Sequence, residues 1–119
     1  MFGKIKWLAV ITLVLLFIAC DLDPGPGGGT TPGIPTNVKA VPDSSTAIKI
    51  TWNTVTGATD YDVYVEVGST PIRIITVQGT SHTHTGLQPN TTYNYYISAK
   101  NKVGESGLSN RASAITLSK

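Results

Sequence analysis

From Ile34 onward the chain alternates hydrophobic and polar residues with a period of two, the pattern of strands that bury one face. The alternation is clearest in residues 61–67 and 93–100, where aromatic and aliphatic residues share one side. Turn-forming residues separate the predicted strands, which are 38–40, 48–52, 61–67, 73–77, 80–85, 93–100 and 109–117. This pattern predicts an all-β, immunoglobulin-like antiparallel sandwich of about seven strands.

The first 33 residues follow a different pattern. Lys4 and Lys6 precede an apolar run from Trp7 to Ala19, which has the length of a secretory signal's hydrophobic region rather than of a bilayer-spanning helix. The residues that follow are rich in Gly and Pro and poor in apolar side chains, as in a flexible tether. We therefore expect a signal peptide over 1–19, a tether over 20–33 and a folded domain over 34–119.

Cys20, the only cysteine, lies where the apolar run ends. The residues Phe17-Ile18-Ala19-Cys20 resemble the lipobox of bacterial lipoproteins, in which the cysteine is diacylated and becomes the new N-terminus, although Phe17 stands where that motif usually has Leu. The resemblance implies lipidation of Cys20 and a location on the cell membrane or the outer membrane, facing the periplasm or the exterior. The alternatives are a plain secretory signal and an uncleaved signal anchor.

Charge and size narrow the classes of function. The chain has 9 Lys and Arg against 7 Asp and Glu, so the numbers become equal once Lys4 and Lys6 are removed with the signal. A neutral chain argues against nucleic-acid binding, which needs a clustered surplus of cations. The remaining length allows one domain, and a single cysteine cannot form an internal disulfide, so a hydrophobic core must stabilise the fold alone.

A set of residues along the predicted domain resembles the fibronectin type III family. They are Pro35, Trp52, the segment 61–64 (Tyr-Asp-Val-Tyr), the segment 87–93 (Leu-Gln-Pro-Asn-Thr-Thr-Tyr) and the segment 101–106. The resemblance implies that Trp52 is the core tryptophan and that Tyr93 is a tyrosine-corner residue, whose hydroxyl bonds to the backbone near residues 87–89. We expect a structural core that includes Trp52, Tyr61, Leu87 and Tyr93, with a polar partner for the tip of each buried Trp or Tyr.

The resemblance leaves function open, because such domains serve as adhesion modules, receptor ectodomains and spacers. The Arg-Gly-Asp motif of integrin-type adhesion is absent from residues 100–107.

Candidate chemistry is sparse. His82 and His84 share one face of a predicted strand, but two imidazoles fall short of a zinc site, so we interpret them as structural or solvent-facing, with metal binding as the alternative. Asp62 and Glu66 fall on an outward face, where we interpret them as solubilising charges. No nucleophile, base and orienting residue can be assembled, and no phosphate-binding loop follows a strand. We therefore expect no enzyme activity, no cofactor and no metal.

Tyr64 and Tyr96 are the main candidates for binding. Alternation places them on the outer faces of neighbouring strands, with Asn94, Ser98 and Glu66 nearby. Exposed tyrosines among small polar residues are typical of recognition patches, and the alternative is a cross-strand pair that only stabilises the sheet.

Together these features predict a monomeric, non-enzymatic binding or scaffolding module of the bacterial cell envelope. Its lipid would bind the membrane, and its partner would be an envelope protein or a glycan. The alternatives are a spacer without a ligand and a carbohydrate-associated module.

Overall fold

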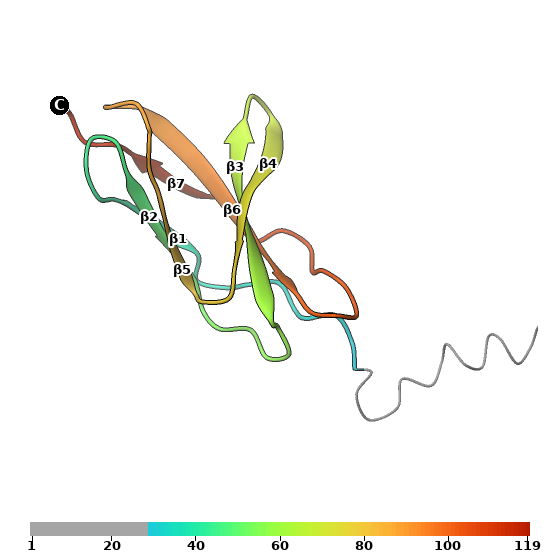
Figure 1. The fold of residues 1–119 in the computed structure, drawn as a ribbon. Coiled ribbons are helices and arrows are strands. Elements are labelled where there is room, and N and C mark those ends of the chain that lie inside the picture. Colours follow the sequence, from blue (N-terminus) through green and yellow to red (C-terminus); the bar gives the residue numbers. More distant parts are fainter. Residues whose placement is uncertain (1–28) are drawn as a thin grey trace, which may run out of the picture.

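The computed structural model describes residues 29–119, which form a β-sandwich (Figure 1). The predicted signal peptide, Cys20 and the first part of the tether lie outside the described residues. The seven strands are β1 Lys39–Pro42, β2 Ile48–Thr51, β3 Asp60–Val67, β4 Thr70–Val77, β5 Ser81–His84, β6 Thr92–Lys100 and β7 Ala112–Ile115. Residues 29–119 contain no helix that is long and apolar enough to cross a membrane.

The strands form two antiparallel sheets. One has three strands in the order β1-β2-β5, and the other has four in the order β4-β3-β6-β7. The predicted all-β sandwich is therefore confirmed. The inner faces of the two sheets supply the core, and the outer face of the four-stranded sheet is the surface on which the predicted binding residues lie.

The β3–β4 hairpin differs from its prediction, because β4 begins at Thr70 rather than at Arg73. Val67 pairs with Thr70, which leaves a two-residue turn, and Gly68 adopts the positive φ of 67° that such a turn needs at its first position. The strand includes Pro71, which has no backbone N–H to donate to a neighbouring strand. A proline is tolerated there because β4 is an edge strand of its sheet.

The core contains apolar side chains from both sheets and from the adjoining loops. Its buried members are Ile48, Ile50, Trp52, Tyr61, Val63, Val65, Leu87, Tyr95, Ile97, Ala99 and Ala114. The rings of Trp52 and Tyr61 pack with their centroids 5.6 Å apart. Tyr93 is only partly buried and packs against this cluster.

The polar tips of the two packed aromatics differ. The backbone N–H of Val55 donates to the Tyr61 hydroxyl at 2.8 Å. The buried Nε1 of Trp52, by contrast, has no hydrogen-bond partner within residues 29–119, so the expectation of a partner is wrong for this residue. Burial of the indole ring outweighs the lost hydrogen bond, because a ring of this size removes a large apolar area from water.

Candidate functional site

The candidate site is the outer face of the four-stranded sheet, where the structure brings together the five residues predicted for binding. Tyr64 of β3 and Tyr96 of β6 are direct cross-strand partners. Glu66 and Asn94 lie one step along the same face and are linked by a hydrogen bond of 3.0 Å from the Asn94 amide. Ser98 lies one step in the other direction, opposite Asp62.

Glu105, from the loop between β6 and β7, organises one end of this face. Its Oε2 accepts a hydrogen bond from the Tyr64 hydroxyl at 2.8 Å and a second from the Ser98 hydroxyl. Ser98 is fully buried beneath this contact. Partial burial, followed by the hydrogen bond to Glu105, raises the pKa of Tyr64, so its hydroxyl stays protonated and remains a donor.

Glu66 is the centre of a second polar network, toward β7. Besides the Asn94 amide, the Arg111 guanidinium contacts its Oε1 at 3.5 Å. Ser113 of β7 in turn donates to the Asn94 side-chain oxygen. These contacts tie three strands together on the outer face.

Asp62 is the centre of a third network and is not a solubilising surface charge. The residue is 0% exposed, because the Arg73 and Lys100 side chains approach its carboxylate at 3.4 Å each. The Thr76 hydroxyl donates to the same carboxylate. Alternation placed Asp62 on the correct face, but long side chains from neighbouring strands lie over it, as their flexible stems allow.

Tyr96 differs from the other tyrosines. Within residues 29–119 its hydroxyl makes no hydrogen bond, whereas the other tyrosine hydroxyls each have a partner, namely Tyr61, Tyr64, Tyr93 and Tyr95. Tyr96 is also partly exposed in the middle of the sheet. Its ring and its hydroxyl are therefore partly accessible from outside the domain.

Tyr93 has the geometry that the family resemblance implies. The backbone N–H of Gln88 donates to its hydroxyl at 3.0 Å. The N–H of the adjacent Leu87 donates to the Thr46 carbonyl at 3.0 Å, which connects this corner to the loop between β1 and β2.

The two histidines lie on the face of β5 that points toward the core. They pair with Ile50 and Ile48, and His84 Nδ1 lies 2.9 Å from the hydroxyl of the fully buried Tyr95. Burial lowers the pKa of both imidazoles and raises the pKa of Tyr95. The two histidines and Tyr95 are therefore uncharged near pH 7. Residues 29–119 hold no cluster of three or more potential metal ligands.

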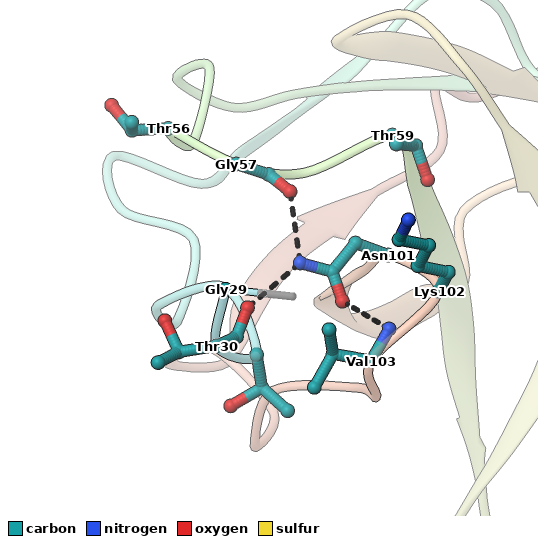
Figure 2. Close-up of a pocket in the computed structure, with 9 residues that line it drawn as sticks. Gly29, Thr30, Thr56, Gly57, Thr59, Asn101, Lys102 and Val103 are labelled. Carbon is teal, nitrogen blue, oxygen red and sulfur yellow. Dashed lines mark hydrogen bonds between the residues drawn. The ribbon is translucent and has the colours of Figure 1, made fainter. Parts of the chain in front are cut away.

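A pocket of about 650 Å³ lies at the end of the domain where residue 29 enters (Figure 2). Asn101 is its central residue, since its side-chain amide donates to the carbonyls of Thr30 at 2.8 Å and Gly57 at 3.1 Å. The Asn101 side-chain oxygen accepts from the N–H groups of Val103 at 2.8 Å and Gly104 at 3.1 Å. One asparagine thus joins the N-terminal segment to two loops.

The pocket has little reactive chemistry. Its lining is mostly glycine, threonine and asparagine, and Lys102 is its one ionisable side chain among the described residues. The last residues of the predicted tether form part of its wall, and Pro32 is buried against the domain.

Sequence reasoning missed several residues of these sites, among them Arg73, Glu105, Arg111 and Asn101. Arg73 and Arg111 could have been found by extending the alternation into the edge strands. No sequence signal indicated that Glu105 or Asn101 would reach residues about 40 or more positions away.

Comparisons with known proteins agree with this architecture. The family profile described as "Fibronectin type III domain" matches residues 33–115. Exochitinase 1 from Streptomyces olivaceoviridis is 42% identical over 67 residues, which cover 55% of this chain and 11% of that protein. The Poly(3-hydroxybutyrate) depolymerase from Ralstonia pickettii is 34% identical over 99 residues, covering 82% of this chain and 20% of that protein.

Among solved structures, the one titled "Crystal Structure of FN3tt" superposes with a TM-score of 0.72 at 27% identity, covering 76% of this chain and all of that one.

Proposed function

The chain belongs to the fibronectin type III family, and from this premise we propose that it is a non-enzymatic binding module of the bacterial cell envelope. In this proposal a lipid on Cys20 holds the protein at a membrane, and the outer face of the four-stranded sheet meets the partner. Confinement at a surface raises the effective concentration of the domain toward other envelope components, so a modest contact suffices.

The observation that carries this proposal is the Tyr96 hydroxyl, which has no hydrogen-bond partner in the part of the chain that the structure describes. It lies on a face where the side chains of Tyr64 and Asn94 are already held by hydrogen bonds to Glu105 and Glu66. A face organised in advance loses little conformational entropy on binding. Tyrosine is also among the residue types that dominate the energy of protein interfaces.

The relatives support a non-catalytic module. This chain spans only 11% and 20% of the length of the two reported enzymes, so what they share is a small part of each. Their names refer to two chemically different polymers, and a general binding or spacing role fits both better than recognition of one substrate.

Two experiments test the anchor. Mass spectrometry of the N-terminus of the purified native protein is expected to find a diacylglyceryl group on Cys20 and no residues before it. The Cys20→Ser variant is expected to leave the membrane fraction, and a native protein that is recovered with an unmodified thiol at Cys20 would contradict this part of the proposal.

The binding face is tested by crosslinking in intact cells, followed by capture of the full chain. The Tyr96→Ala variant is expected to lose a specific crosslinked partner. The Thr83→Ala variant, altered on the exposed side of β5 in the other sheet, is expected to keep it. The same partners captured with both variants would contradict binding by the outer face, and capture of none by the native chain would favour a spacer.

A carbohydrate-associated module is the second candidate, favoured by the match to an exochitinase. It predicts that the full chain sediments with insoluble chitin and that Tyr96→Ala releases it. Absence of the native chain from the chitin pellet would remove this candidate.

A further inference from the structure

Four side chains form a row across the outer face, one from each strand of the sheet or its immediate flank. Arg73 of β4 pairs with Tyr64, and Tyr64 pairs with Tyr96. Tyr95 pairs with Ala112, so the next position of the same register places Arg111, just before β7, opposite Tyr96. We call these residues the Arg-Tyr row; three strand spacings give it a span of about 14 Å.

On this face the positive charges lie nearer the solvent than the negative charges with which they pair. The side chains of Arg73 and Arg111 are each 56% exposed, whereas the carboxylates that they contact, on Asp62 and Glu66, are 1% and 16% exposed. Each guanidinium therefore lies above its carboxylate, and an approaching partner meets the cations first.

Both guanidinium groups keep unused donors. Each contacts its carboxylate through a single nitrogen, at 3.4 Å for Arg73 and 3.5 Å for Arg111. A guanidinium has five N–H groups, and within residues 29–119 neither arginine makes another side-chain hydrogen bond. Such a group can bind a further carboxylate in the paired geometry that favours Arg over Lys.

We propose that the Arg-Tyr row binds an acidic segment on the surface of a partner protein, an inference that rests on the function proposed above. Carboxylates of the partner meet Arg73 and Arg111, and a polar group meets the Tyr96 hydroxyl between them. A protein fits better than a small ligand, because the site is an open sheet face rather than a concavity. Tyrosine and arginine are also enriched in protein interfaces.

Glu105 provides a test in the opposite direction, because it carries a negative charge. It is an exposed carboxylate at the margin of the row, held against Tyr64. Its charge opposes an acidic partner, so its removal strengthens binding, whereas removal of either arginine weakens it.

The experiment measures binding of fluorescently labelled poly-L-glutamate to the full chain at low ionic strength. The double variant R73Q/R111Q is expected to bind about tenfold more weakly, an effect typical of important arginines in interfaces. The matched double variant K39Q/K49Q removes the same charge from the other sheet and is expected to change binding less than twofold. Glu105→Gln is expected to strengthen binding, and added salt to weaken it.

The single variant Arg111→Gln is included in case the double variant does not fold. We expect it to fold, because the Asn94 amide still contacts Glu66. It is expected to weaken binding about threefold, with an unchanged circular dichroism spectrum. Equal losses in the two double variants would overturn the proposal, because they would indicate non-specific attraction.

No binding of poly-L-glutamate by the native chain would also overturn it. If Tyr96→Ala still loses its crosslinked partner in cells, the failure lies in the acidic chemistry alone and the proposed function stands. If that partner is retained as well, the proposed function fails with it.

Discussion

The hydroxyl of Tyr93 is expected to stabilise the domain through one hydrogen bond, and Tyr93→Phe removes that bond alone. The ring keeps its packing against the core, while the Gln88 N–H loses its acceptor at 3.0 Å. Gln88 is exposed, so water can replace the acceptor and the cost stays near the net value of a hydrogen bond, about 1 kcal/mol. For a domain of this size that corresponds to a fall in Tm of about 4 to 8 °C.

Two other tyrosines give matched comparisons. Tyr61→Phe removes a bond of 2.8 Å from Val55 beneath a buried ring, where water is less able to enter, so we expect a larger loss of about 1 to 3 kcal/mol. Tyr96→Phe removes a hydroxyl with no partner within residues 29–119, so we expect a change within about 0.5 kcal/mol. Urea unfolding followed by far-UV circular dichroism measures all three.

The relative losses of stability in the three variants test the role assigned to each hydroxyl. A loss of stability in Tyr96→Phe as large as that in Tyr93→Phe would refute the idea that Tyr96 is kept for an external partner. An unchanged midpoint in Tyr93→Phe would show that its hydroxyl does not hold the corner.

The remaining predictions concern a buried charge, a histidine and a tight contact. Asp62→Asn removes the carboxylate beneath two cations and is expected to lower the free energy of unfolding by about 1 to 3 kcal/mol, measured in urea. Burial lowers the pKa of His84 below its ordinary 6.5, so the unfolded chain binds a proton at this residue more readily than the folded chain does. We therefore expect this group to leave Tm unchanged above about pH 6.5 and to lower Tm as the pH falls below that value. His84→Gln is expected to reduce that fall. In Gly104→Ala the new Cβ would lie 2.7 Å from Thr31 Cγ2, so we expect faster proteolysis of residues 29–33, whereas Gly107→Ala, with a nearest approach of 3.5 Å, is expected to leave it unchanged.

Alternation predicted the part of the structure that depends on side-chain direction. Tyr64 and Tyr96 are paired on one outer face because every second side chain of a strand points to the same side. This side is predictable where the alternate side chains are buried in a core. The same rule placed Trp52 and Tyr61 on inner faces, and both are buried.

Alternation cannot predict what covers a face. Asp62 is buried by Arg73 and Lys100, which are 11 and 38 residues away, and the reach of such flexible side chains is set by tertiary packing. The Glu105 contact with Tyr64 depends likewise on a loop whose path no periodicity describes.

Site-specific photo-crosslinking in intact cells tests most directly whether the outer face of the four-stranded sheet is the binding surface. A photoreactive amino acid in place of Tyr96 is expected to give a discrete adduct, and the same amino acid in place of Lys49, on the exposed side of β2, is expected to give none. Adducts from position 49 alone, or the same adducts from both positions, would contradict the account.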